Sequence, residues 1–252
     1  QHTNITKNEK IAALINIKDY PKKKLDNYIK EVQSLHNSDD IENTLIVISE
    51  KKLKEGYGAK KIIDSPNNQY ILVYDSKEKM NRAKLKLSSS VISVEQNIKY
   101  SFSDNNSSSS GYNSWGVEKM GLDKIIAKSK TEDFDKVVVA VLDSGCDIDI
   151  FNKYYPGKLD GFKNIIDNRN IMYDNNGHGT HVAGTIAEAT SDNVKILPVK
   201  QTDSSSIYLT DNLASLNWII YNDKADVINM SFGSVYASYA MYQLLTACKD
   251  NN

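Results

Sequence analysis

Two side chains in the C-terminal half of the sequence have the chemistry and the setting of an acid–base pair. Asp143 comes directly after an apolar run at residues 137–142, and Ser144 and Gly145 then let the chain turn away. His178 stands where a loop becomes a predicted helix, and a glycine on each side leaves its imidazole room to project into a cleft. A carboxylate held at a strand end can orient and tune a histidine that acts as general base for a nucleophile. The pattern therefore predicts nucleophilic catalysis supported by Asp143 and His178.

Other interpretations of these residues remain open at the level of sequence. Asp143 could be only a turn or capping residue, and a phosphorylated aspartate would need a second carboxylate at a spacing that the sequence lacks. His178 could be a buried structural histidine. Together with His181, one helical turn away, it could also bind a metal, but the sequence shows no third ligand and we predict no metal site. Cys146 could be a reactive thiol, although a buried small hydrophobe is the commoner outcome, and we assign it no role.

The elements that must position the pair alternate between strands and helices. Residues 114–252 contain continuous apolar runs, which are typical of strands covered on both faces of a sheet. The predicted strands lie at 137–142, 194–199 and 227–230. One predicted helix begins at His178, and two more cover 210–221 and 236–249. This order predicts an α/β fold with a doubly wound parallel sheet, in which functional groups collect beyond the carboxyl ends of the strands.

The first 100 residues follow a different pattern. Residues 1–40 predict a helical lead-in, with helical spacing at 7–17 and 22–35; its lysines at 22–24 could dock anions, but a solvated helix face is the commoner outcome. Residues 41–100 predict a small α+β module of ferredoxin-like βαββαβ order. Its predicted elements are strands at 44–48, 60–63, 70–74 and 91–94 and helices at 51–56 and 76–87.

A polar linker separates this module from the larger domain. Residues 101–113 contain Asp104, Asn105 and Asn106 and four consecutive serines at 107–110, a composition with nothing to bury. The segment is either an inert surface loop or a protease-accessible junction between two domains. The domain at 114–252 follows it.

Composition excludes several classes of protein. The 252 residues carry 31 basic and 32 acidic side chains, a net charge of -1, which argues against binding nucleic acid or an anionic membrane through bulk charge. The apolar runs are too short to span a bilayer. Two cysteines are too few for a disulfide scaffold, and no zinc-type cluster or other cofactor motif is present. Because the chain begins at Gln1 rather than Met, we expect a removed leader and a secreted, extracellular or cell-surface protein.

Five segments carry a resemblance to a known family. Residues 139–145 and 177–185 closely resemble the Asp and His signatures of subtilisin-like serine proteases, whose triad follows the chain order Asp, His, Ser. Residues 112–121 look like the start of a mature catalytic domain, and residues 225–233 look like the strand that ends in the substrate-binding edge. The module ending at 91–100 resembles the family's propeptide.

The resemblance implies roles for particular residues. Asp143 would hold and charge-stabilise His178, which would act as general base and then general acid for a serine. Ser231, Phe232 and Gly233 would pair with an extended peptide or protein substrate and help to form the wall of its P1 pocket. The propeptide would be an intramolecular chaperone and inhibitor whose tail lies in the cleft. The resulting zymogen would cleave itself near Tyr100 and Ser101 or within the serine-rich linker.

The family's nucleophile and oxyanion-hole asparagine do not occur in these residues. Ser144 belongs to the turn after Asp143 and Ser234 to the predicted substrate edge, and neither stands in a Gly-Thr-Ser context. We therefore expect a propeptide followed by the first half of a catalytic domain, with a C-terminal half that carries the serine as a partner. The alternative is a catalytically inactive subtilisin-like protein that binds peptides or regulates a partner protease. The short stretch at 188–193 predicts that a calcium loop found in many family members is absent.

Overall fold

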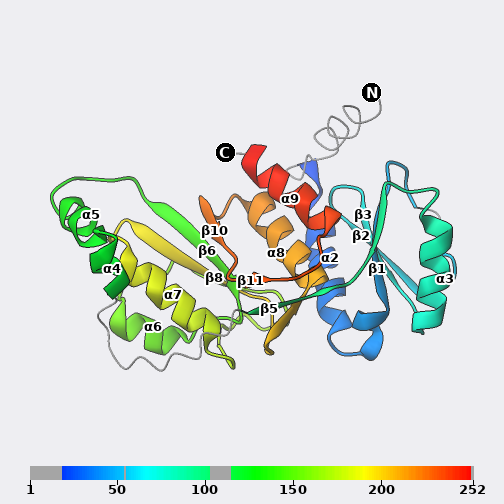
Figure 1. Cartoon of the computed structure of the whole chain (residues 1–252), viewed down its shortest axis with the longest axis horizontal. Coiled ribbons are helices and arrows are strands. Elements are labelled where there is room, and N and C mark those ends of the chain that lie inside the picture. Colours follow the sequence, from blue (N-terminus) through cyan, green and yellow to red (C-terminus); the bar gives the residue numbers. More distant parts are fainter. Residues whose placement is uncertain (1–18, 54, 103–114, 251–252) are drawn as a thin grey trace.

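The computed structural model describes residues 19–53, 55–102 and 115–250 (Figure 1). The helical pattern at 7–17 and linker residues 103–113 lie outside these ranges. Within them the chain forms three β-sheets with helices packed against them. One sheet belongs to the N-terminal module, one to the C-terminal part, and the third joins the two.

The N-terminal module is a four-stranded antiparallel sheet with the strand order β2-β3-β1-β4. Its strands are β1 (Thr44–Ile48), β2 (Lys61–Ser65), β3 (Gln69–Val73) and β4 (Ser93–Gln96). Helix α3 (Lys77–Leu87) begins with a side-chain cap, because Ser76 Oγ accepts a hydrogen bond from the Lys79 amide. The helix covers one face of the sheet. This strand order is that of the predicted ferredoxin-like module.

One predicted helix of this module is wrong. Residues 51–53, 55 and 56, the described part of the stretch 51–56, form a loop. Only Leu53 and Ala59 of this connection pack against the sheet, and two apolar side chains are too few for a helical face. The Tyr74 hydroxyl donates to the Gly56 carbonyl oxygen at 2.8 Å and holds the loop beside β3.

The C-terminal part contains the predicted parallel sheet, with the strand order β10-β6-β8-β7. Its strands are β6 (Val137–Asp143), β7 (Lys163–Asn164), β8 (Val194–Lys200) and β10 (Val227–Asn229). On one face lie α6 (Ile148–Tyr154) and α7 (His178–Ala189), and on the other lie α8 (Leu209–Asn222) and α9 (Tyr239–Asp250). Two short helices, α4 (Trp115–Lys119) and α5 (Leu122–Ser129), precede β6. Helices on both faces confirm the doubly wound arrangement.

A small antiparallel sheet links the two parts. Its central strand is β5 (Lys99–Phe102), flanked by β9 (Ser206–Tyr208) and β11 (Phe232–Gly233). Ser101 and Phe102, which composition assigned to the linker, therefore belong to a strand. The reason is tertiary: both edges of β5 find partners, and alternate side chains, Tyr100 and Phe102, become buried.

Helix α2 (Lys22–Leu35) has the predicted bounds and lies between the two parts (Figure 1). It contacts both β2 and α8 and belongs to the same core as α8 and α9. A short 3-10 helix, η2 (Asp39–Asn43), connects it to β1. The lysines at 22–24 are exposed. No helix in the described residues is both long and apolar enough to cross a membrane.

Candidate active site

Asp143 and His178 meet at the carboxyl end of β6. Asp143 is the last residue of this strand, and His178 is the first residue of α7. His178 Nδ1 lies 2.8 Å from Asp143 Oδ1 and 3.0 Å from Oδ2. The Asp143 side chain is fully buried, whereas the imidazole is 20% exposed. A buried carboxylate thus orients one ring nitrogen of a histidine whose ring still reaches the surface.

The Asp143 carboxyl is held by the turn that follows it. The Ser144 amide donates to Oδ1 at 2.7 Å. Burial raises the pKa of Asp143 above its ordinary value, and the hydrogen bonds from His178 and the Ser144 amide oppose that shift. The geometry suits a carboxylate that stabilises an imidazolium, because the same oxygens that orient the ring would face its charge.

Asp174, which sequence analysis did not single out as a site residue, organises the start of α7. Its Oδ1 accepts from the Ser144 hydroxyl and the Gly177 amide, each at 2.8 Å. Its Oδ2 accepts from the Thr180 amide at 2.8 Å and from the Thr180 hydroxyl at 2.6 Å. Burial opposes ionisation, but these hydrogen bonds lower the pKa of Asp174 below its ordinary value. Its signal in the sequence is an aspartate four residues before the helix, close to an N-capping position.

Glycines allow α7 to approach the catalytic turn. Gly177 has φ +90°, a conformation that favours glycine. A Cβ on Gly179 would collide with the carbonyl oxygen of Gly145. Gly179 therefore allows α7 to lie against the 143–145 turn, and Gly177 allows the left-handed backbone conformation that starts the helix.

The chain's own β5 strand covers this pair. The Phe102 ring stacks on the His178 imidazole, with a centroid distance of 4.3 Å and an interplanar angle of 20°. In the strand pairing, Phe102 lies opposite Phe232 and Ser101 opposite Gly233, while Tyr100 meets the Phe232 ring edge-on at 5.7 Å. The structure thus brings Phe232 and Gly233 to an extended peptide. Ser231 precedes β11, and its hydroxyl donates to Asn229 Oδ1 at 2.9 Å.

Comparison with protein families places the segment that contains both residues. Residues 135–251 match the family described as "Subtilase family". They form part of a subtilase domain. The match begins just before β6 and includes α7, β8, α8 and α9.

Several curated proteases resemble part of the chain. "Subtilisin-like protease 5" of Arthroderma gypseum is 38% identical over 108 residues, which cover 39% of this chain and 26% of that protein. "Cell wall-associated protease" of Bacillus subtilis is 31% identical over 157 residues, covering 57% and 17%. "Intracellular serine protease" of Paenibacillus polymyxa is 37% identical over 109 residues, covering 38% and 33%. The chain thus spans a third or less of the length of these relatives.

One solved structure resembles most of the chain. The crystal structure of the epidermin leader peptide processing serine protease (EpiP) from Staphylococcus aureus matches with a TM-score of 0.52 at 15% sequence identity. The match covers 82% of this chain and 56% of that one. At this identity the likeness concerns the fold alone. It reaches beyond the subtilase segment into the N-terminal antiparallel α+β module, which resembles a propeptide.

Lys200 is a further member of the site that sequence analysis missed. It ends β8 directly beside Asp143 in the parallel pairing, and its side chain is fully buried. Its Nζ donates to the Ser144 carbonyl oxygen and, at 3.0 Å, to that of Thr202. It pairs with Asp203 at 2.8 Å. Lys200 therefore ties the turn after Asp143 to the loop that leads into β9.

Other candidate residues of the subtilase segment take no part in the pair. Burial raises the pKa of the Cys146 thiol to about 12, so it stays protonated. His181 is exposed on α7. In the described ranges, no group of three or more His, Cys, Asp or Glu side chains could hold a metal. After α7, the Lys158 ammonium donates to the carbonyl oxygens of Thr190 at 2.9 Å and Ser191 at 2.6 Å.

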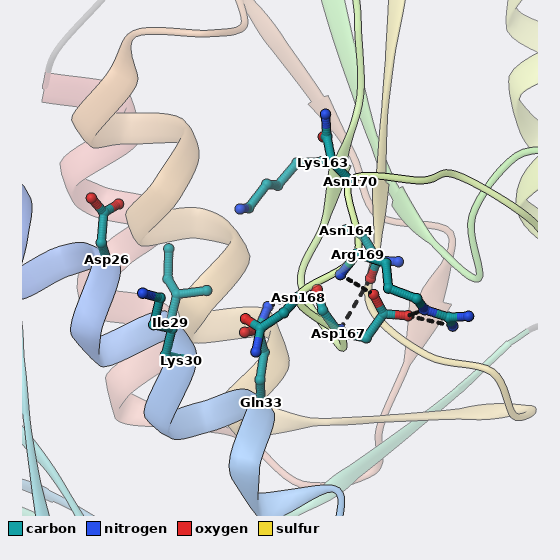
Figure 2. A pocket seen from close by; sticks show the side chains of 10 residues that line it. All are labelled: Asp26, Ile29, Lys30, Gln33, Lys163, Asn164, Asp167, Asn168, Arg169 and Asn170. Atoms are coloured by element: carbon teal, nitrogen blue, oxygen red, sulfur yellow. Dashed lines mark hydrogen bonds and ion pairs between the residues drawn. The ribbon is translucent and has the colours of Figure 1, made fainter.

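A polar cavity of about 280 Å³ lies away from the pair, between α2 and the loop at 163–170 (Figure 2). Neither Asp143 nor His178 lines it. Cationic, carboxylate and amide side chains from α2 and from the loop line it. The lining residues are Asp26, Ile29, Lys30, Gln33, Lys163, Asn164, Asp167, Asn168, Arg169 and Asn170. The cavity therefore belongs to the interface between α2 and the subtilase segment.

Proposed function

We propose that these residues come from a serine endopeptidase made as a zymogen, in which Asp143 and His178 are two members of an Asp-His-Ser triad. One observation carries the proposal: Asp143 Oδ1 lies 2.8 Å from His178 Nδ1 while a peptide strand stacks on the imidazole. The subtilase match over 135–251 supports the reaction class. The chain spans a third or less of the length of its relatives, so the activity of the whole protein is part of this proposal.

In the proposed mechanism, His178 takes the proton of the serine hydroxyl as the oxygen attacks the substrate carbonyl. It then gives that proton to the leaving amine. Asp143 keeps the proton on Nδ1, so that Nε2 can accept, and it stabilises the imidazolium. The serine would come from a C-terminal half of the domain. Phe232 and Gly233 would hold the substrate as an added antiparallel strand, as they hold β5, with Ser231 at the start of this edge.

The N-terminal module would act as an inhibitory prosegment. In the proposed division, 1–40 leads into a module at 41–100, and 101–113 connects it to the peptidase domain, with β5 extending the module to Phe102. A strand that fills the cleft excludes substrate until the chain is cut and the module leaves. An enzyme inactive until maturation suits export to the cell surface or medium. One relative is named as cell wall-associated and another as intracellular, so this localisation stays a proposal.

We expect maturation to cut beyond Phe102. The bond between Tyr100 and Ser101 lies inside the paired β5 strand, and the residue stacked on His178 is Phe102. A bond beyond Phe102, at the edge of or within 103–113, is therefore better placed for the triad than the Tyr100–Ser101 bond. N-terminal sequencing of the matured protein should find a first residue between 103 and 114. A mature form that begins at Ser101 would contradict this placement.

The experiment that tests the function uses the full-length protein together with the C-terminal half that is proposed to carry the serine. After the linker is cut, we expect hydrolysis of casein and labelling of one serine by a fluorophosphonate. Intact mass and terminal sequencing would identify the species that carries the serine. Peptide binding without turnover or labelling would instead favour the alternative, a peptide-binding protein that regulates a partner protease.

A further inference from the structure

We infer that α2 and His36 form a second docking element of the prosegment, which holds it on the α8 face of the subtilase segment through a hydrogen bond from the partly exposed His36 to the buried Asp211 carboxyl. The inference rests on the proposed function, because it assumes that the N-terminal module must stay bound and later leave. It assigns a role to residues that precede the ferredoxin-like module and that never reach the cleft.

Helix α2 packs between β2 of the module and α8 of the subtilase segment. Its buried apolar side chains follow helical spacing and are at most 4% exposed; they are Leu25, Tyr28, Ile29, Val32 and Leu35. They lie in one core with side chains of β2 on one side and α8 on the other. In the last turn of α2, Gln33 Nε2 donates to the Asp167 carbonyl oxygen at 3.0 Å. The helix therefore grips the subtilase segment at two separate places.

The contact between His36 and Asp211 joins the end of α2 to the first turn of α8. His36 Nε2 lies 2.8 Å from Asp211 Oδ1, and the Asp211 side chain is 1% exposed. Among the described residues, Asp211 Oδ2 has no hydrogen-bond partner. A buried carboxylate whose one side-chain partner is removed is costly to leave in place, although the Tyr208 backbone also acts on Asp211. Loss of His36 should therefore weaken the hold of α2 directly.

The surface of α8 that α2 and the module cover carries polar groups beside its apolar core contacts. Thr210, Asp211 and Asn217 are fully buried there, whereas Asn212 and Ser215 accept from Gln201 inside the subtilase segment. Thr210 and Asn217 bond to the module, since Asn67 Nδ2 donates to Asn217 Oδ1 at 3.1 Å and Asn97 Nδ2 to Thr210 Oγ1 at 3.3 Å. The polar cavity of Figure 2 also lies beside α2, between this helix and the loop at 163–170. Water can therefore replace these contacts when the module departs.

The charges around His36 set the sign of a pH effect. Burial lowers its pKa, but the hydrogen bond and charge of Asp211, with the charge of Asp203, raise the pKa of His36 overall. Burial raises the pKa of Asp211, and the bond to His36 partly opposes this. The Tyr208 ring faces His36 edge-on at 6.4 Å, and the Lys99 ammonium lies over that ring at 4.9 Å. Docking therefore takes up protons, so the contribution of this contact to docking is fully present below the ordinary histidine pKa of about 6.5 and is lost as pH rises through the raised pKa of docked His36.

The test separates binding from catalysis. Full-length protein with Asp143→Asn, which prevents self-digestion, would carry a recognition sequence for an added protease within residues 103–113. After cutting, gel filtration from about pH 6 to about pH 9 would follow how much N-terminal fragment stays bound. We expect retention to fall as pH rises. His36→Gln should speed release by about tenfold at the lower pH, because Asp211 stays buried without its partner.

Matched variants make the result specific. Asp211→Asn should remove the pH dependence, and combining it with His36→Gln should restore retention. Lys79→Gln, which breaks an exposed ion pair with Asp75 inside the module, should change nothing. Equal release by wild type and His36→Gln, or a pH profile that Asp211→Asn leaves unchanged, would overturn the inference. If His36→Gln does not fold, the Asp211→Asn profile decides. None of these readouts requires the protein to be a peptidase.

Discussion

Replacing Asp143 with asparagine is expected to lower kcat/KM of the full-length protein, cut within its linker by an added protease, by about four orders of magnitude. The carboxylate accepts from His178 Nδ1 at 2.8 Å, whereas an amide can turn its NH₂ toward the ring and favour the wrong tautomer. Nε2 would then carry the proton and could not accept one from the serine. Assays of kcat and KM with one peptide substrate would measure the loss, which should fall on kcat.

A nearby aspartate provides the matched control for this substitution. Asp149 lies exposed on α6, a few residues beyond the catalytic turn. Asp149→Asn removes the same charge from the same region without touching His178, so its kcat/KM should equal that of the wild type. A linker-cut Asp143→Asn enzyme with more than about a tenth of wild-type kcat would remove Asp143 from the triad, because loss of a triad member leaves far less than this.

Replacing Lys200 with methionine is expected to reduce both stability and turnover. Methionine matches the length of the chain but has no donor, so the carbonyl oxygens of Ser144 and Thr202 lose their buried partner. Unpaired buried acceptors cost roughly 1–3 kcal/mol each, and we expect the free energy of unfolding to fall by about 2–4 kcal/mol in urea titrations. The turn that holds Asp143 would also loosen, lowering kcat by about tenfold with little change in KM.

Another lysine of the same strand shows whether the effect is local. Lys195 Nζ donates to the Gly157 carbonyl oxygen at 2.9 Å, but at the exposed surface, where water can replace it. Lys195→Met should change the free energy of unfolding by less than about 0.5 kcal/mol and leave kcat unchanged. Equal effects of the two substitutions, or a Lys200→Met enzyme of normal kcat, would show that Lys200 does not position the catalytic turn.

Local sequence was sufficient for the features that depend on local physics. The apolar run before Asp143 predicts a strand buried on both faces, and the glycines around His178 predict room at the start of its helix, and the structure places the two side chains together. The bounds of α2 follow from the spacing of its apolar side chains. The parallel sheet follows from the alternation of strands and helices. Each of these signals lies within a short stretch of sequence.

The remaining features depend on partners far away in the sequence. Ser101 and Phe102 look like linker until β9 and β11 flank them, and Lys200 looks like a surface lysine until the pairing of β6 with β8 sets it beside Asp143. His36 and Asp211 are 175 residues apart, and neither has a local signal of the contact. Burial and hydrogen bonding at these positions come from long-range packing, which fixes the charge environment of a side chain without leaving a periodic trace in its neighbours. Residue types and spacing thus singled out Asp143 and His178, while tertiary packing decided which strand lies against them and which residues contact that strand.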